Sequence, residues 1–305
     1  MRVILIVKDG IMARNLEQIY MSDLYYIAPT DRASLADGRA VLTDSEARHL
    51  TRVMRKKTGD EAELFDGSGK AYRARIDAIS RDRVELTVLE TKEDDREPEL
   101  ALTAIVALPK GDRQKWAIEK LTELGVKRFI PLDAERADVK FDEGVRERLE
   151  RQVLEASKQC GRLRIMNVLP SIAPCELPGL VELLDAKNNA NASVKELSEL
   201  AQTLSERFAG FGLFDEITSD SDVLRVVAHP ISDGFFGQTS FMNLIHSRKS
   251  VPDAALLLIG PVGGFTDEEV KNAVEQGWSP LDLGKQVYRV ETAAIVAAAL
   301  LLHLY

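Results

Sequence analysis

The spacing of apolar and polar residues indicates that the first part of the chain is rich in β-strands. Glu61–Phe65, Ala71–Ile79 and Arg83–Leu89 are short segments in which apolar and polar residues partly alternate, as they do in strands that bury one face. Asp66-Gly67-Ser68-Gly69 separates the first two segments and predicts a hairpin turn. A short helical pattern over His49–Met54 precedes them. We therefore expect a small, mainly β unit at the N-terminal end.

Beyond residue 98 the pattern becomes that of an α/β domain. Continuous apolar runs, which are typical of strands buried on both faces, occupy Leu100–Leu108, Arg128–Leu132, Val223–Ala228 and Ala254–Gly260. Segments with helical spacing lie between and after them, at Trp116–Leu124, Phe141–Gln159, Thr266–Gln276 and Val290–His303. Strands that alternate with helices of this length predict a mostly parallel sheet with helices on both faces.

The domain boundary is expected where the pattern changes. Glu93–Pro98 is charged, ends in proline and has no apolar anchor, which is typical of a linker. The sequence thus predicts domains over 1–97 and 98–305. Two stretches interrupt the alternation of the second domain, acidic amphipathic helices around 177–222 and a mixed loop around 231–252. We interpret both stretches as surface insertions.

Composition limits the class of protein. The 305 residues are 45% hydrophobic and 29% charged, which is the balance of a soluble globular protein. The apolar run Ala293–Tyr305 is shorter than the roughly 18 to 20 residues that cross a membrane. Val3–Val7 is too short for a signal-peptide core, so we expect a cytoplasmic protein. Cys160 and Cys175 lack the spacing of a disulfide scaffold or a zinc site, and no metal is expected.

Charge is unevenly distributed along the chain. The formal net charge is −9, yet residues 48–83 carry ten basic and six acidic side chains, a local charge of +4. Residues 176–225 carry ten acidic and four basic side chains, a local charge of −6. The basic stretch suits a nucleic acid, although an ordinary solvated surface explains it as well on charge alone.

A glycine-bearing loop is the first candidate for chemistry. Gly260-Pro261-Val262-Gly263-Gly264 follows a buried strand, and Thr266 can cap the next helix. Such a loop lets the backbone approach a ligand at the edge of an open α/β sheet. The acidic residues Asp267–Glu269 already occupy the positive helix end, which argues against a phosphate there. The spacing is neither that of a Walker loop nor that of a GxGxxG fingerprint, and a plain strand-to-helix turn explains it equally well.

A second candidate lies at the start of the most apolar helix. Leu281–Tyr288 contains a short strand and a glycine turn, and Arg289 and Glu291 follow it. Charged groups are expensive at the start of a core helix unless they are paired or functional. An Arg–Glu pair that caps the helix and an arginine that belongs to a site are both consistent with the pattern.

These two segments resemble the C-terminal signature of the RsmE family, the 16S ribosomal RNA (uracil-N3)-methyltransferases of the SPOUT superfamily. The segments that carry the resemblance are LLIGPVGGFTDEEV and LDLGKQVYRVETAAIVAAALL. Further segments agree in the family's order, namely HLTRVMRKKTGDEAELFDGSGKAYRARI, LPKGDRQKWAIEKLTELGVKRFIPLDAERADVKF, ASKQCGRLRIMNVLP and VVAHP. The resemblance runs from about His49 to Tyr305 and is interrupted by the two insertions.

The resemblance implies a fold and a cofactor. It implies an N-terminal PUA-like β-barrel that contacts RNA and a C-terminal α/β SPOUT domain with a deep trefoil knot. Members of the family bind S-adenosyl-L-methionine in the knot and work as homodimers. Carried over to this chain, the cofactor-binding residues are Ala228, His229, Ile259, Gly260, Gly263, Gly264, Leu283, Gly284, Val287 and Tyr288.

The resemblance also implies a reaction, methylation of N3 of a uridine in small-subunit ribosomal RNA, free or in the assembled small subunit. The uracil imide is a weak acid, so its deprotonation needs a base or a nearby cation. Arg289 is the candidate that holds the uracil and its developing charge, because an arginine stays protonated and cannot be the base. Glu291 either orients Arg289 or accepts the proton, and the sequence leaves both roles open.

Basic residues on both domains are candidates for the RNA backbone. They are Arg52, Arg55 and Lys56 on the first domain and Lys110, Arg136 and Arg162 on the second. For any one of them a solvated surface position is an equal alternative.

Two departures from the family pattern affect the cofactor loops. Relatives commonly have Gly-Pro-Glu-Gly-Gly where this chain has Val262 at the third position, and Leu-Gly-Pro-Arg where it has Lys285 and Gln286. Binding through backbone groups should survive these changes. A catalytically silent RNA-binding or ribosome-assembly factor, and a methyltransferase with a different RNA target, are the alternatives that the departures and the insertions suggest.

Overall fold

The computed structural model describes residues 24–93, 96–134, 136–137, 139–187, 197–213, 217–218, 221–228, 239–240, 243–244, 248 and 250–303. The chain forms two compact units that divide between Glu93 and Asp94. The division falls inside the stretch that the sequence suggests as a linker. The apolar run Val3–Val7 and the predicted cofactor residue His229 lie outside the described residues.

The first unit is built on a five-stranded sheet with the order β1-β3-β4-β5-β2. Its strands are β1 (Leu24–Tyr26), β2 (Arg39–Thr43), β3 (Glu61–Phe65), β4 (Lys70–Ile79) and β5 (Arg83–Glu93). Its helical segments are η2 (Pro29–Asp37), α1 (Asp44–Arg48) and η3 (His49–Val53). All strand pairs are antiparallel except β1 with β3, and two register shifts interrupt the pairing of β4 with β5. Such irregularities bend a sheet, which suits the curled sheet of a small barrel.

The turn between β3 and β4 is fixed by a buried carboxylate. Asp66 accepts hydrogen bonds from the Ser68 backbone N–H at 2.9 Å and from the Ser68 hydroxyl at 2.6 Å. The Tyr72 hydroxyl donates to the other Asp66 oxygen at 3.2 Å. The Ser68 bonds hold the pKa of Asp66 below its usual value although burial opposes them, whereas burial and the Asp66 charge raise the pKa of Tyr72 to about 12. The predicted hairpin is therefore present.

The second unit is built on a seven-stranded parallel sheet with the order β10-β12-β9-β11-β6-β7-β8. Its strands are β6 (Ala101–Ala107), β7 (Arg128–Leu132), β8 (Asn167–Val168), β9 (Val223–Ala228), β10 (Thr239–Ser240), β11 (Ala254–Ile259) and β12 (Ser279–Asp282). Its helices are α2 (Asp112–Leu124), α3 (Glu143–Cys160), α4 (Leu177–Lys187), α5 (Glu199–Arg207), α7 (Asp267–Glu275) and α8 (Val290–His303), and η4 (Pro174–Glu176) precedes α4.

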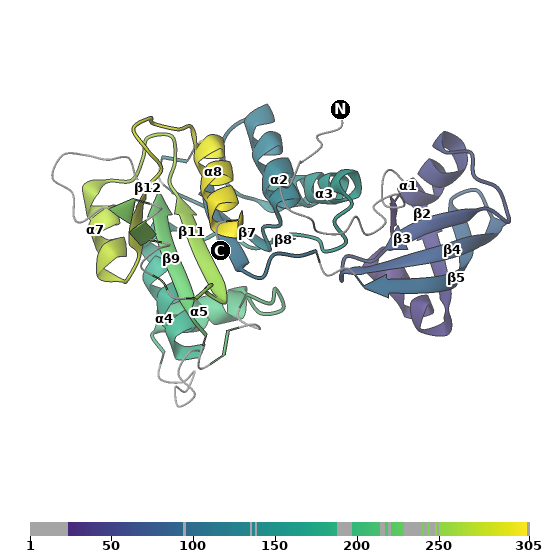
Figure 1. Cartoon of the computed structure of the whole chain (residues 1–305), viewed down its shortest axis with the longest axis horizontal. Coiled ribbons are helices and arrows are strands. Elements are labelled where there is room, and N and C mark those ends of the chain that lie inside the picture. The colour runs from purple at the N-terminus through teal and green to yellow at the C-terminus, as the bar shows by residue number, and fades with distance from the viewer. Residues whose placement is uncertain are drawn as a thin grey trace, which may run out of the picture. The chain divides into compact units, whose positions relative to one another are not determined.

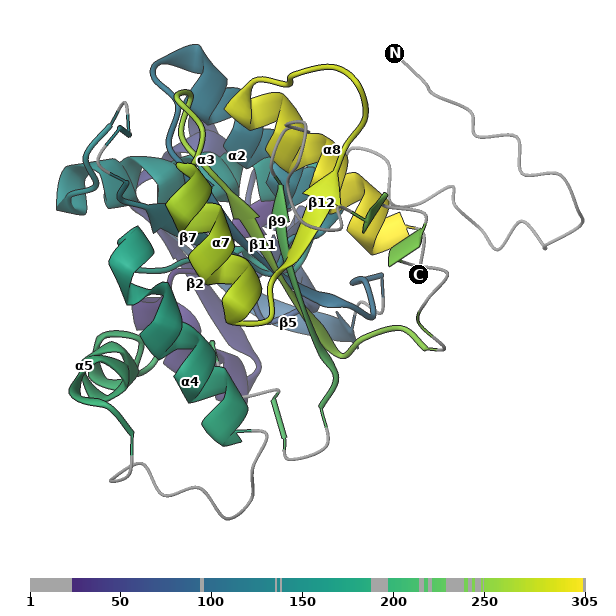
Figure 2. The same cartoon turned by 90° about the vertical axis from the view of Figure 1, so that its left-hand side faces the viewer.

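Helices cover both faces of this sheet, as the continuous apolar runs predict (Figures 1 and 2). Successive residues of β6 point to opposite faces. Leu102, Ala104 and Val106 belong to the core beneath α2, α3 and α8, whereas Ile105 and Ala107 belong to the core beneath α4, α5 and α7. The central strands are therefore apolar at most positions, and Thr103 of β6 is a buried exception.

The interpretation of residues 177–222 as a surface insertion is wrong for its two helices. Leu180 and Leu184 of α4 and Leu204 of α5 are fully buried and belong to the second core. Their helical spacing forms an apolar stripe that covers one face of the sheet. Of the second stretch, 231–252, the structure describes only a few residues, and Thr239–Ser240 there pairs with β12.

The strand order brings three loops to one edge of the sheet. β12 follows β11 in sequence but lies on the far side of β9. Because the strands are parallel, the carboxyl ends of β9, β11 and β12 lie side by side. Ligands bind at such an edge in open α/β sheets, where the strand order reverses.

Candidate active site

A cavity of about 330 Å³ lies at this edge. Its volume falls within the roughly 300 to 1,000 Å³ of small-molecule sites. It is lined by Arg113, Ala228, Ile259, Gly260, Pro261, Val262, Gly264, Phe265, Leu281, Asp282, Leu283, Gly284, Gln286, Val287, Tyr288, Arg289, Val290 and Ala293. The structure thus brings together the ends of β9, β11 and β12 and the start of α8. Of the predicted cofactor residues it describes, all but Gly263 line the cavity.

The first wall is the loop after β11. A Cβ atom on Gly260 would lie 2.8 Å from the Phe265 ring, so only glycine fits there. Gly264 has a φ of +71° and donates its N–H to the Pro261 carbonyl oxygen at 2.8 Å, which closes a tight turn. Thr266 then begins α7 with a capping box, in which its hydroxyl accepts from the Glu269 N–H at 3.2 Å. The predicted cap and the predicted close turn are both present.

The second wall is the loop after β12. Gly284 has a φ of +113° and donates its N–H to one carboxylate oxygen of Asp282 at 2.7 Å. Asp282 lines the cavity, and its second carboxylate oxygen accepts no hydrogen bond from the described residues. Sequence reasoning missed Asp282, although an acidic residue at the carboxyl end of a parallel strand is a common partner of ribose hydroxyls.

Arginines surround the cavity. Arg289 is exposed and lines it, as does Arg113 at the start of α2, which sequence reasoning also missed. Arg136, predicted to contact RNA, lies beside the first wall, since its Cδ is 3.3 Å from the position of a Cβ on Gly263. None of the three guanidinium groups has a carboxylate partner among the described residues. In a chain of net charge −9 this arrangement favours an anionic ligand.

Glu291 does not pair with Arg289 in the described structure. Its side chain is 4% exposed, and one carboxylate oxygen is buried without a hydrogen-bond partner among the described residues. It is absent from the cavity lining. The positive end of a helix favours a carboxylate in its first turn, so this position is consistent with support of the α8 start.

The basic residues of the first unit are accessible. Arg52 and Arg55 are exposed, and Lys56 donates its Nζ to the Glu61 carbonyl oxygen at 3.1 Å. Arg55 has a φ of +56°, a conformation that is uncommon for a side chain of its size. Val53, which is 64% exposed, lies between the two arginines in sequence. The segment therefore presents both charged and apolar groups to solvent.

Arg162 is a correction to the predicted RNA-contacting set. It is 8% exposed, and its guanidinium donates to both carboxylate oxygens of Glu97, at 2.9 and 2.8 Å. The remaining N–H groups donate to the carbonyl oxygens of Thr122, Gly125 and Val126 at 2.9 to 3.2 Å. A guanidinium with these partners is unavailable to a phosphate, so Arg162 holds the end of α2 to Glu97. Lys110 is exposed and stays a candidate.

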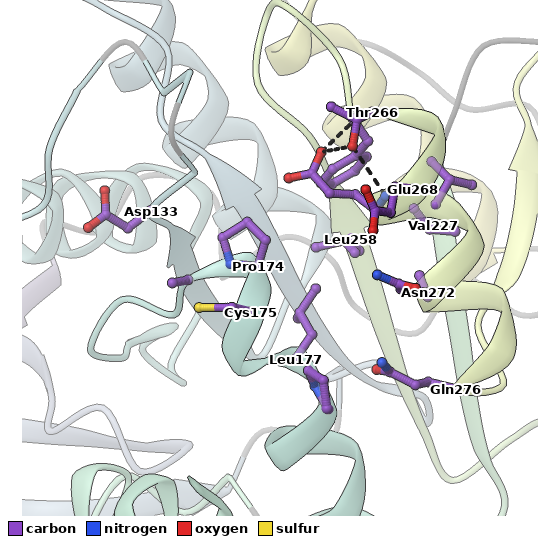
Figure 3. A pocket seen from close by; sticks show the side chains of 16 residues that line it. Asp133, Pro174, Cys175, Leu177, Val227, Leu258, Thr266, Glu268, Asn272 and Gln276 are labelled. Atoms are coloured by element: carbon purple, nitrogen blue, oxygen red, sulfur yellow. Dashed lines mark hydrogen bonds between the residues drawn. The ribbon is translucent and has the colours of Figure 1, made fainter.

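A larger cavity, of about 610 Å³, lies between α7 and the segment that leads into α4 (Figure 3). Thr266, Glu268 and Asn272 lie on one side of it, and Pro174 and Cys175 lie on the other. Its described lining contains acidic side chains but neither lysine nor arginine. It contains none of the predicted site residues, and its charge is unsuited to a nucleic acid. The smaller cavity is therefore the better candidate for the active site.

The described part of the chain contains neither a candidate membrane span nor a candidate metal site. No helix there has the length and apolar character needed to cross a membrane. No group of three or more histidine, cysteine, aspartate or glutamate side chains is placed there to hold a metal ion.

Comparisons with known proteins agree with this geometry. The model of a family described as an RNA methyltransferase domain matches residues 96–210 and 186–302, and that of an RNA methyltransferase PUA domain matches residues 42–89. The chain is 27% identical to ribosomal RNA small subunit methyltransferase E of Bacillus subtilis over 84% of this chain and 86% of the relative. It is 29% identical to the protein of the same name from Synechocystis over 87% of this chain and 73% of the relative.

A solved structure that contains a bound cofactor has a similar fold. A methyltransferase of Legionella pneumophila in complex with the cofactor SAM is 25% identical, with a TM-score of 0.65 over 92% of this chain and 97% of that one. The predicted fold class is confirmed, with a PUA-like curled sheet followed by a parallel α/β domain. The SPOUT architecture and its trefoil knot are consistent with such neighbours.

Proposed function

We infer that this chain, which belongs to the RNA methyltransferase family whose domain model spans most of its second unit, methylates N3 of a uridine in small-subunit ribosomal RNA with S-adenosyl-L-methionine as donor. One observation carries the proposal. The two glycine-bearing loops meet in one cavity, and arginines that lack carboxylate partners among the described residues border it. The names of the curated relatives support ribosomal RNA of the small subunit as the substrate.

The residues of the cavity fit S-adenosylmethionine. Gly260, Gly264 and Gly284 have no side chain that would keep an adenine ring from the backbone, and Leu283 and Val287 supply apolar surface. The free oxygen of Asp282 can accept a ribose hydroxyl or the donor's ammonium group. When bound, S-adenosylmethionine supplies an electrophilic methyl group. We expect the backbone to make most contacts with the adenine, so Val262 in place of the family's glutamate should leave cofactor binding intact.

In this proposal the residues of the chain position the uracil and stabilise its anionic form. Arg289 holds the base at the cavity and stabilises the negative charge that forms when the imide proton leaves. Alignment of the attacking nitrogen with the methyl carbon supplies several kcal/mol more. The position of Glu291 outside the cavity lining favours a positioning role over that of proton acceptor.

RNA is bound by basic residues of both units in this proposal. Arg52, Arg55 and Lys56 contact the backbone from the first unit, and Lys110 and Arg136 do so from the second. In this proposal the substrate is ribosomal RNA, free or within the assembled small subunit, and the protein acts in the cytoplasm.

The protein acts as a homodimer in this proposal. The stripe of α8 that carries Ile295, Val296 and Ala299 is only partly covered by the described residues, and Val287, at the cavity, is 79% exposed. Apolar surface of this kind is typical of an interface between protein chains.

Light scattering tests the dimer. It should give a mass twice that of the 33.8 kDa chain, and Ile295→Lys should reduce the mass to that of the monomer.

Methyl transfer to purified small-subunit RNA tests the function. We expect isotope from labelled S-adenosylmethionine to enter the RNA and nucleoside digestion to yield 3-methyluridine as the labelled product. Label in another nucleoside would assign a different reaction. Tight RNA binding without any transfer would support the silent assembly factor instead.

A further inference from the structure

Arg113 is a cation without an evident structural purpose. It is the second residue of α2, is half-buried, and lines the active-site cavity together with Arg289. The described residues give it neither a hydrogen bond nor an ion pair. The two other cations of α2 differ in this respect, because Lys115 pairs with Glu119 at 3.6 Å and Lys120 pairs with Glu123 at 2.7 Å.

Its position costs stability. A helix N-terminus carries a partial positive charge, so a cation in the first turn is repelled. Partial burial adds a desolvation cost that no described carboxylate offsets. A charge that opposes folding and faces a cavity is typical of a functional group.

The cavity determines which anion Arg113 can meet. S-adenosylmethionine carries a sulfonium and an ammonium group against one carboxylate, so the donor as a whole is a cation. Asp282 is the carboxylate of the lining, and one of its oxygens already accepts the Gly284 N–H. The remaining anion at the reacting end is the uracil ring after its imide proton has left.

The uracil anion has two oxygens that can each accept hydrogen bonds from a cation. Loss of the N3 proton spreads negative charge over O2 and O4, the two carbonyl oxygens that flank N3. A guanidinium is a planar donor that stays charged and binds such oxygens without blocking the nitrogen between them. Arg113 comes from the start of α2 and Arg289 from the loop before α8, so the two reach the cavity from different elements.

We propose that Arg113 is a second catalytic arginine, which together with Arg289 holds the two carbonyl oxygens of the uracil anion and thereby lowers the pH at which N3 becomes nucleophilic. The N3–H proton passes to water, N3 forms a bond to the methyl carbon, and the sulfur–methyl bond breaks with its electrons remaining on sulfur. The inference rests on the proposed uridine-N3 methylation.

Single-turnover methylation of small-subunit RNA tests the role of Arg113 across a pH series. Arg113→Gln should lower the rate about 100-fold near neutral pH, and the loss should shrink as the pH rises and the imide ionises unaided. Arg113→Lys should recover part of the rate, because it keeps the charge and loses the planar fork. Lys115→Gln, on the same helix, is the matched control and should match the wild type.

Other outcomes overturn the proposal. A constant rate loss at every pH, with weaker RNA binding and a smaller salt dependence, would assign Arg113 to a phosphate. A tenfold weaker affinity for S-adenosylmethionine by calorimetry would assign it to the donor's carboxylate. An unchanged Arg113→Gln rate in an active wild type would remove it from the reaction, whereas a wild type that is inactive at every pH would refute the proposed function itself.

Discussion

Arg162 and Arg289 show how burial decides what an arginine does. The Arg162 guanidinium is enclosed by Glu97 and three carbonyl oxygens, whereas Arg289 is exposed at a cavity. The local sequence suggested a function for both. Only the tertiary contacts of Arg162 with Glu97, which lies 65 residues away in sequence, separate this structural arginine from the arginine at the cavity.

Substitution of Arg289 tests its role in transfer. Arg289→Ala should reduce methyl transfer by about 100-fold or more, because the cation that stabilises the uracil charge is lost. Calorimetry should show nearly unchanged affinity for S-adenosylmethionine, and circular dichroism should show an unchanged fold. Wild-type transfer rates in this variant would exclude Arg289 from the mechanism.

Lys127 gives the folded chain a distinct pH dependence. Burial and the neighbouring Arg128 and Arg164 lower the pKa of Lys127 to about 8, from about 10.4 in an unfolded chain. Between these values the unfolded state holds more protons, so this residue's contribution to stability rises as the pH increases. Lys127→Met should therefore be more stable than the wild type near pH 7 in urea unfolding. The difference should vanish by about pH 10, and a difference independent of pH would contradict the argument.

The residues of the site differ in how far the sequence alone predicts them. Gly260 and Gly264 are recognisable as candidates because glycines that follow a buried strand let the backbone approach a ligand, and both line the cavity. Arg113 and Asp282 escaped notice because nothing in their local sequence distinguishes them from surface charges. They lie at one cavity because the fold brings α2, β12 and the start of α8 together there.

At the level of elements, long apolar segments were predicted well and short strands were not. β6, β7, β9 and β11 lie within a residue or two of the expected segments, because full burial requires continuous apolar runs. β1, β2 and β8 have two to five residues and were missed, since so few positions carry no measurable period. The packing of α4 and α5 was misjudged because acidic composition concealed their apolar stripe.

The contact between α4 and α5 can be tested with a pair of helical glycines. A Cβ on Gly179 of α4 would lie 2.8 Å from Leu200 Cγ of α5, whereas the nearest atom to a Cβ on Gly144 of α3 is at 3.4 Å. Gly179→Ala should destabilise the protein by about 1 to 3 kcal/mol through overpacking. Gly144→Ala should stabilise it by about 0.5 to 1 kcal/mol through helix propensity. Equal effects of the two changes in thermal or urea unfolding would show that α5 does not pack against Gly179.

At the scale of the whole molecule, the uneven charge reconciles an acidic protein with an RNA substrate. The first unit contains the basic stretch, and arginines border the cavity of the second. A net charge of −9 by itself would argue against a nucleic acid. The distribution of charge is the relevant quantity, because contacts with phosphates are local.

The salt dependence of RNA binding measures these contacts. Arg52→Ala should weaken binding and reduce the slope of log affinity against log salt concentration by about 0.7 to 0.9. Arg83→Ala is the matched control, because Arg83 is exposed and pairs with Glu85 at 3.1 Å. If both variants keep the wild-type slope, Arg52 does not contact the RNA backbone.

Calorimetric titration of the purified protein with S-adenosylmethionine tests the central claim, that the cavity holds the methyl donor. The wild type should bind one cofactor per chain. Gly260→Val should abolish that binding, because its side chain would collide with the Phe265 ring at the first wall. Gly144→Ala, remote from the cavity, should bind like the wild type. Saturable binding that survives Gly260→Val would place the donor elsewhere, and no binding by the folded wild type would contradict the assignment of this protein as an active methyltransferase.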